Sequence, residues 1–327
     1  MTNESTHTLK SVLSLALLAA CGPEATPNIA GTIVAGRTSN FSAWSDPVSL
    51  GSTINSSFND QQTALSKDGL SLYFASGRPG STGAAGVLDI WVSHRDCLTC
   101  PWSGPTNLGP SVNTAFSEAA PALSRDGHRL FFLSGRPGFG SGDIWVSWRE
   151  QVHDDFGWQA AVNLGAGVNT AGFEGGPSYF ENDVTGVAQL YFNHNPAPVN
   201  SGGDIYVSEQ AADGTFGPAS PVVELNSPSS EQRPTVAHNG LEIYFFSDRP
   251  GSSSEDIWFS TRESVLAPWS PPTNLGSPIN TGASERHPLI VTHGGMEWLY
   301  FTRNVATAPA VDNDLFVSTR TRRGTTP

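Results

Sequence analysis

One segment recurs five times along the chain, about every 50 to 60 residues, and this repeat limits the fold more than any other feature. Each copy is an Asp followed by two apolar residues, and the copies begin at Asp89, Asp143, Asp204, Asp256 and Asp314. An apolar triplet precedes each copy, as in Leu72-Tyr73-Phe74 of the first unit. Such a period is typical of propellers and solenoids, in which each repeat forms one supersecondary unit.

The order of apolar runs and turns predicts four strands in each unit. In the first unit these are residues 63–66, 72–74, 89–91 and 102–109, with an Asp68-Gly69 turn after the first strand. Asp-Gly is a preferred two-residue hairpin turn. The second and third strands are apolar on consecutive residues, which indicates a sheet covered on both faces, as in stacked propeller blades. We therefore predict an all-β, five-bladed β-propeller with four antiparallel strands per blade.

The two ends of the repeat region complement each other. The first recognisable strand, residues 44–50, corresponds to the fourth strand of a unit, and the last, residues 314–320, corresponds to the third strand of a unit. A complete fifth blade forms only if these two strands pair, and that pairing removes the exposed edges of an open array. We predict that residues 44–50 lie antiparallel beside residues 314–320 and close the ring.

The first 40 residues are predicted to serve export rather than the fold. Residues 11–20 form an apolar run too short to span a bilayer, and Leu18-Ala19-Ala20-Cys21 fits the bacterial lipobox. The alternative is an ordinary signal peptide followed by a chance cysteine. We expect a signal peptide at 1–20, lipidation of Cys21, a tether at 21–40, the propeller at 41–320 and a basic tail at 321–327. This predicts an outer membrane lipoprotein on the periplasmic or cell-surface side, with the lipid as its membrane contact.

The remaining two cysteines, Cys97 and Cys100, lie in a Cys-Leu-Thr-Cys segment. In an exported protein a short disulfide loop is the first hypothesis. A structural zinc site would need two further ligands, and the sequence contains no second cysteine pair. A redox-active pair would normally open a helix, and no helix is predicted here.

The most regular polar feature is an Asn followed five residues later by a carboxylate. The acids are Asp60, Glu118, Glu174, Glu231 and Glu285, one in each unit, just before the innermost strand. One hypothesis places them as a carboxylate ring at the mouth of the central channel, where unpaired acids would call for a cation such as Ca²⁺. The alternative is structural, with each acid bonded to backbone N–H groups or to a repeat arginine such as Arg78, Arg136 or Arg249.

Composition and charge limit the partners. The formal net charge is −13 and the only basic cluster is at the C-terminal end, so nucleic acid is not expected as a ligand. The histidines show no ligand spacing, and no firm metal site or other cofactor is predicted. Trp148 and Trp298 fall outside the repeat register, and the third unit departs most from it, with Gln210 where the other units have Arg. We expect a monomer that binds an envelope protein, a peptide or a glycan.

The units resemble the WD40-like propeller repeats of the TolB type. The resemblance rests on Asp68-Gly69, Leu72-Tyr73-Phe74, Ser76-Gly77-Arg78-Pro79-Gly80 and Asp89-Ile90-Trp91, and on their counterparts in the second and fourth units. It implies an exported envelope protein used mainly for interactions.

These observations lead to two functional hypotheses. The first is a non-catalytic binding or protein-interaction module in the cell envelope, which is not an enzyme and has no catalytic residues. The alternative is a carbohydrate-active enzyme or glycan-binding protein, because five-bladed propellers include glycosidases. Glycosidases need two or three carboxylates in distinct environments, whereas the five repeat acids are nearly equivalent. The sequence contains no Gly-x-Ser-x-Gly motif, so a serine hydrolase is not expected.

Overall fold

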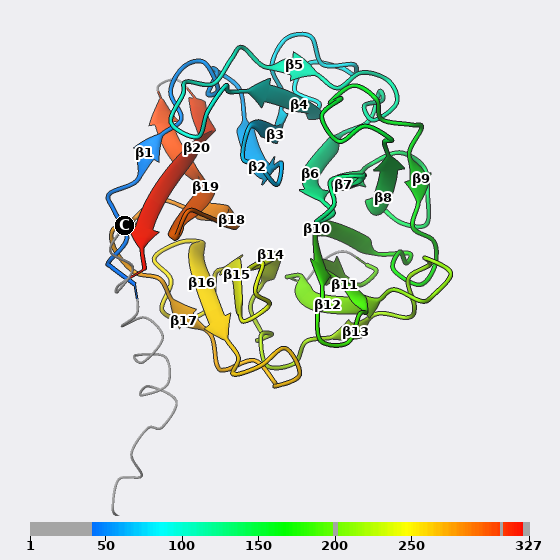
Figure 1. Cartoon of the computed structure of the whole chain (residues 1–327), viewed down its shortest axis with the longest axis vertical. Helices are drawn as coiled ribbons and strands as arrows, with labels where there is room; N and C mark the ends of the chain where they lie inside the picture. Colours follow the sequence, from blue (N-terminus) through cyan, green and yellow to red (C-terminus); the bar gives the residue numbers. More distant parts are fainter. Residues whose placement is uncertain (1–40, 199–201, 308–309, 323–327) are drawn as a thin grey trace, which may run out of the picture.

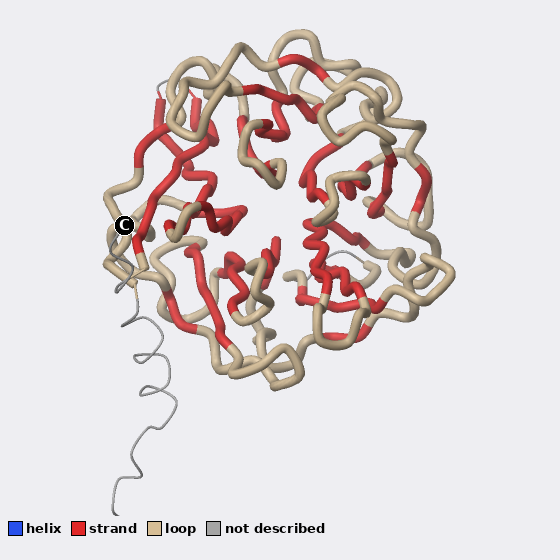
Figure 2. The backbone as a smooth tube through the Cα atoms, viewed as in Figure 1, coloured by secondary structure: helices blue, strands red, loops and turns tan. Residues whose placement is uncertain are grey.

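The computed structural model describes residues 41–198, 202–307 and 310–322. All the regular elements within these ranges are β-strands, and they form five four-stranded sheets arranged around a common centre (Figures 1 and 2). The predicted all-β, five-bladed propeller is therefore confirmed. In the part of the chain described, no helix is long and apolar enough to span a bilayer. The predicted signal peptide, Cys21 and the tether lie outside the described residues.

Four of the blades are built from strands that are consecutive in the sequence, each antiparallel to the next. Blade 1 contains β2 (Asp60–Leu65), β3 (Ser71–Ser76), β4 (Asp89–His94) and β5 (Thr106–Asn107). Blade 2 contains β6 (Glu118–Leu123), β7 (Arg129–Ser134), β8 (Asp143–Trp148) and β9 (Val162–Asn163). Blade 3 contains β10 (Phe173–Glu181), β11 (Ala188–Asn195), β12 (Asp204–Glu209) and β13 (Ser220–Pro221). Blade 4 contains β14 (Glu231–Val236), β15 (Glu242–Ser247), β16 (Asp256–Thr261) and β17 (Thr273–Asn274).

The fifth blade joins the two ends of the described chain. It contains β18 (Glu285–His293), β19 (Met296–Thr307), β20 (Ala310–Thr321) and, as its outer strand, β1 (Val48–Ser49). Val48 pairs with Val317 in antiparallel register, and the Leu50 amide donates to the Leu315 carbonyl at 3.0 Å. Figure 1 shows β1 lying beside β20. The predicted closure of the ring by the N-terminal strand is confirmed.

Some strand limits differ from those expected. The innermost strand of the first unit begins at Asp60 rather than Thr63, so its repeat acid is part of the strand. The outer strand of this blade has only two residues, Thr106–Asn107, rather than the expected 102–109, and the outer strands of the other blades are equally short. In blade 5, β20 begins four residues before Asp314, because β19 and β20 pair along their whole twelve-residue lengths.

The hydrophobic core lies between the blades rather than within them. β15 and β16 are buried at every residue, as expected for strands covered on both faces. The described residues form five buried clusters, each shared by two neighbouring blades. The cluster that completes the ring joins Leu72 and Phe74 of blade 1 to Tyr300 and Leu315 of blade 5. Closing the ring is therefore needed to bury the faces of its first and last blades.

A repeated arginine contributes to the contact between neighbouring blades. Arg149 stacks over Trp158 at 4.3 Å and donates to the hydroxyl of Tyr73, in the preceding blade, at 2.9 Å. The same arginine–tryptophan stacking recurs in the pairs Arg95–Trp102, Arg262–Trp269 and Arg320–Trp44. Most of the repeated tryptophans are thus explained by packing. In blade 3, Gln210 replaces this arginine.

Candidate functional site

The five repeat acids are buried parts of the blades. Each lies at the start of an innermost strand and has no exposed surface, and none of them lines the central cavity described below: Asp60, Glu118, Glu174, Glu231 and Glu285. Each has a cationic or histidine partner, in the pairs Asp60–Arg78 (2.6 Å), Glu118–Arg136 (3.2 Å), Glu174–His194 (2.7 Å), Glu231–Arg249 (2.8 Å) and Glu285–Arg303 (2.8 Å). The acids therefore hold the blades together, as the structural alternative predicts, and do not form a carboxylate ring at a channel mouth.

Further hydrogen bonds occupy the remaining carboxylate oxygens. Glu231 accepts the Ser227 amide at 2.9 Å and the Ser227 hydroxyl at 2.6 Å. Each of the other acids accepts the same two hydrogen bonds from a Ser or Thr four residues before it. The acids therefore lack the free oxygen ligands that a shared Ca²⁺ ion would need. Among the described residues, no group of three or more His, Cys, Asp or Glu side chains is placed to hold a metal.

The Asn five residues before each acid connects one blade to the previous one. Asn113 donates to the Ile90 carbonyl at 2.9 Å and accepts the Ile90 amide at 2.8 Å. Asn55 bonds to Leu315 in the same way and so contributes to ring closure. The repeated Asp is structural in blades 1, 2 and 4. Asp89 accepts the Thr82 amide at 2.7 Å and the Asn107 side chain at 2.6 Å, and Asp143 and Asp256 accept the equivalent asparagine side chains at 2.7 Å.

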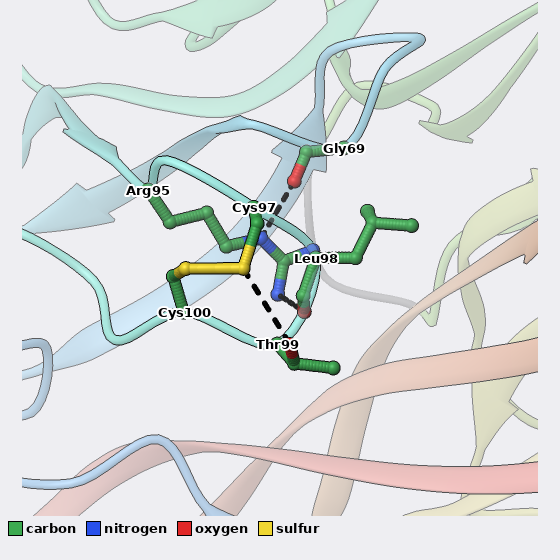
Figure 3. Close-up of a disulfide and its surroundings, with 6 residues drawn as sticks. All are labelled: Gly69, Arg95, Cys97, Leu98, Thr99 and Cys100. Atoms are coloured by element: carbon green, nitrogen blue, oxygen red, sulfur yellow. Dashed lines mark hydrogen bonds between the residues drawn. A yellow bond between two sulfur atoms is a disulfide. The ribbon is translucent and has the colours of Figure 1, made fainter.

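Cys97 and Cys100 are joined by a disulfide in the loop after β4 (Figure 3). Arg95 donates to the Gly69 carbonyl at 2.8 Å and to the Leu98 carbonyl at 2.7 Å, which ties this loop to the β2–β3 turn. With both sulfurs in the disulfide, neither is available as a zinc ligand. The disulfide lies away from the central cavity and staples a loop.

A large cavity lies at the centre of the propeller. Its volume is about 860 Å³, within the usual range for small-molecule sites. It is lined by all five innermost strands, β2, β6, β10, β14 and β18, from their middle to the turns that follow them. Figure 1 shows these strands surrounding the centre of the ring. We call this space the central cavity.

A ring of β-bulges lies at the inner end of the central cavity. The bulged residues have positive φ, and they are Gln62, Ala120, Gly176, Arg233 and His287. A bulge redirects a side chain and is common next to functional sites. Gln62 of blade 1 accepts the Ala120 amide of blade 2 at 2.7 Å, and its Nε2 lies 3.4 Å from Nε2 of His287 in blade 5. We call these five residues the cavity floor, in which Gln62 contacts the neighbouring blades on both sides.

Two carboxylates line the wall of the central cavity and share one arginine. Arg320 Nε lies 2.5 Å from Glu297, and Arg320 Nη2 lies 3.2 Å from Glu242. The Tyr244 hydroxyl donates to Glu242 at 2.9 Å. Burial raises the pKa of the Glu297 carboxyl, and the neighbouring Glu242 charge adds to the rise, while Arg320 opposes it. Paired carboxylates with one raised pKa are an arrangement that can support acid–base chemistry.

A smaller cavity of about 250 Å³ lies between blades 2 and 3, where the repeat arginine is missing. Gln210, Phe216 and Trp148 line it. The Trp148 side chain is 41% exposed and stacks on His128, whereas Trp298 is partly buried against the core. The departure of the third unit from the repeat thus leaves a small surface pocket, and only one of the two out-of-register tryptophans is exposed.

The sequence analysis missed the residues of the central cavity. Arg233, His287 and the Glu242–Glu297 pair were not candidates, because these residues do not recur from unit to unit. A signal was available two residues after each repeat acid, where the units have Gln62, Ala120, Gly176, Arg233 and His287. Variation at one position of an otherwise regular strand indicates a side chain that is not needed for packing.

Comparison with solved structures finds the same fold in glycoside hydrolases. The catalytic domain of a GH62 α-L-arabinofuranosidase from Coprinopsis cinerea is 12% identical with a TM-score of 0.55, covering 86% of this chain and 98% of that one. The Bacillus subtilis arabinanase Arb43A is 16% identical with a TM-score of 0.54, covering 83% and 96%. An endo-arabinase from Bacteroides thetaiotaomicron is 14% identical with a TM-score of 0.54, covering 85% and 97%. No protein-family model and no curated protein matches the sequence.

These comparisons correct three expectations. The predicted relationship to TolB-type repeat proteins is wrong, because the similar structures are glycoside hydrolase propellers and no family model supports the TolB type. The expectations of a non-catalytic interaction module and of a protein that is not an enzyme are overturned by the same similarity. Sequence identity of 10–16% shows the shared fold alone, and that fold is the one on which arabinofuranosidases and arabinanases are built.

Proposed function

We propose that this protein is a carbohydrate-active enzyme that hydrolyses a glycosidic bond in its central cavity. The observation that carries the proposal is the Glu242–Glu297 pair on the wall of a cavity of about 860 Å³. The similarity in fold to glycoside hydrolases supports the same class of activity. Hydrolysis of a glycosidic bond needs one carboxyl that donates a proton and a second that acts as base or nucleophile.

The two carboxyls have different surroundings, which suits them to different roles. The raised pKa of Glu297 keeps a larger fraction of this carboxyl protonated near neutral pH, as a general acid requires. Glu242 accepts hydrogen bonds from Tyr244 and Arg320 and is the candidate for the second carboxylate. Arg320 contacts both acids and is itself held between Phe41 and Trp44, at 4.4 and 4.5 Å, so it positions the pair.

The proposal is tested with the variants Glu297→Gln and Glu242→Gln. α-L-Arabinofuranosides and arabinan are the first substrates to assay, because the similar structures carry those activities in their names. We expect either variant to lose about 100-fold or more of the turnover, the usual contribution of a general acid or base. Release of reducing sugar or of p-nitrophenol from a panel of glycosides measures it.

Glu181→Gln is the matched control, because Glu181 also lines the central cavity but belongs to β10 and not to the pair. It should retain the wild-type rate, and thermal melting should show that all three variants fold. Hydrolysis that survives in Glu297→Gln would contradict the assigned role. Binding of glycans without any turnover by the wild type would contradict the enzyme proposal and leave a glycan-binding protein.

A further inference from the structure

The cavity floor contains a positive charge that the protein does not neutralise. Arg233 lines the central cavity, and among the described residues it forms no ion pair. Its Nη1 atom is buried and has no hydrogen-bond partner. Arg149 and Arg249, by contrast, are paired with Asp155 and Glu231 at 2.7 and 2.8 Å. A partly buried guanidinium without a carboxylate partner is unusual, because burying a charge costs free energy unless it is paired.

A second unpaired polar side chain lies next to Arg233. Asn193 on β11 is 1% exposed, and both its Oδ1 and its Nδ2 lack a hydrogen-bond partner within the described residues. A Cβ atom placed on Gly176 would lie 2.5 Å from Cδ of Arg233 and 2.9 Å from Oδ1 of Asn193, so both side chains crowd this glycine. Only a residue without a side chain leaves room for them here. Buried polar groups without partners usually indicate a missing ligand or water.

The other polar groups of the cavity floor do not compensate the charge. Burial lowers the pKa of His287 well below its usual range, and Arg233 and Arg286 add to the effect, so the imidazole is neutral at pH 7. Its Nδ1 lies 3.2 Å from the Thr302 hydroxyl, and its Nε2 faces the Gln62 amide nitrogen. Burial lowers the pKa of Arg233 to about 9, which still leaves the guanidinium charged at pH 7. The floor therefore carries a net positive charge.

The geometry points to a binding site on the cavity floor for a carboxylate, formed by Arg233 with the Asn193 amide beside it. A carboxylate matches the planar fork of a guanidinium, which can donate two parallel hydrogen bonds to it. The remainder of the central cavity is large enough to hold the rest of the molecule that carries this group. If the proposed glycosidic activity holds, the carboxylate belongs to an acidic sugar of the substrate. A free small carboxylic acid would offer the same chemistry.

Isothermal titration of the protein with D-galacturonate, D-galactose and acetate at constant ionic strength tests this site. The two sugars differ in carrying a carboxylate or a hydroxymethyl group, so galactose is the matched control ligand. We expect galacturonate to bind and galactose to give no heat. Equal binding of the two sugars, or no binding of either carboxylate, would overturn the site. Binding of acetate without galacturonate would support the carboxylate site and identify its ligand as a free acid.

Two arginine variants locate the binding. Arg233→Gln should weaken galacturonate binding about tenfold to a hundredfold, the loss expected for charge-assisted hydrogen bonds. Arg125→Gln should leave the affinity unchanged, because Arg125 lines the same cavity but pairs with Asp183 at 2.6 Å. Equal losses in both variants would overturn the assignment to Arg233. If Arg233→Gln does not fold, Arg233→Lys, which keeps the charge and loses the fork, should bind more weakly than wild type.

The site and the proposed enzymatic function fail independently. Galacturonate binding without hydrolysis of any glycoside would overturn the function and leave the carboxylate site standing. Hydrolysis of neutral arabinan without binding of either galacturonate or acetate would overturn the carboxylate site and leave the function standing.

Discussion

At the scale of single residues, the five repeat acids show how a conspicuous motif can be structural. Each acid is completely buried and is paired with an arginine or histidine side chain from its own blade. In units three and five the Arg-Pro-Gly motif is missing, and the partner comes from the position directly opposite on the second strand, His194 or Arg303. The pairing is thus retained in all five blades even where the sequence motif is lost.

Replacing one partner of such a pair should destabilise the whole protein. Arg249→Leu leaves the Glu231 carboxylate buried without a cation, which typically costs about 3 to 5 kcal/mol. Urea unfolding followed by tryptophan fluorescence measures the change in the free energy of unfolding. Arg125→Leu breaks the exposed Arg125–Asp183 pair and should cost less than about 1 kcal/mol. Similar losses in the two variants would show that burial of the pair is not decisive.

At the scale of elements, the bulge in each innermost strand separates two functions of that strand. Before the bulge lies the repeat acid, which ties the blade together, and after it the strand lines the central cavity. The bulged residue has positive φ and interrupts the ladder, which frees its side chain from packing between the blades. This allows Gln62, Arg233 and His287 to differ while the strand around them stays the same.

The bulge of β18 should make stability depend on pH. The folded protein holds His287 neutral, while the unfolded chain protonates it below its ordinary pKa of about 6.5. The unfolded state therefore binds more protons in acid, and stability falls as pH decreases below that value. This group alone should cost up to about 2 kcal/mol between pH 6.5 and pH 5.

Urea unfolding at several pH values measures this dependence, and His287→Gln should reduce the slope below pH 6.5. His153→Gln is the control, because the His153 side chain is 85% exposed. An unchanged slope in His287→Gln would mean that the imidazole is protonated in the folded protein as well.

At the scale of the whole molecule, stability depends on closing the ring. Residues 41–50 supply the outer strand of blade 5 and the Trp44 ring that stacks on Arg320. Without them, β20 has an exposed edge and Arg320 loses an aromatic partner. The same arginine positions Glu242 and Glu297, so closure also supports the proposed active site.

A truncation series tests the role of closure. Deleting residues 1–50 should lower the free energy of unfolding by about 3 kcal/mol or more, since the partly buried Trp44 and the strand pairing of β1 are both lost. Deleting residues 1–40 keeps β1 and should melt like the full chain. Thermal melting monitored by circular dichroism measures both, and equal stability of the two truncated proteins would contradict a closing role for residues 41–50.

The repeat by itself determined the architecture of this protein. Strand type, blade number and ring closure follow from periodic burial, which each unit encodes in its own sequence and repeats five times. The sequence also pointed to the buried acids, although it left open whether they were structural. The repeat alone did not decide between the interaction module and the alternative of a carbohydrate-active enzyme, which the similar structures favour, because the regular positions report blade packing, which many propellers share.

Only the tertiary structure decided what lies in the central cavity. Gln62, Arg233 and His287 belong to three different blades, and Glu242 and Glu297 to two, so no local pattern connects them. They come together because the ring closes and the bulges turn part of each inner strand away from the blade interface. The repeated positions specify how each blade packs, whereas the side chains of the central cavity occupy positions that differ from unit to unit.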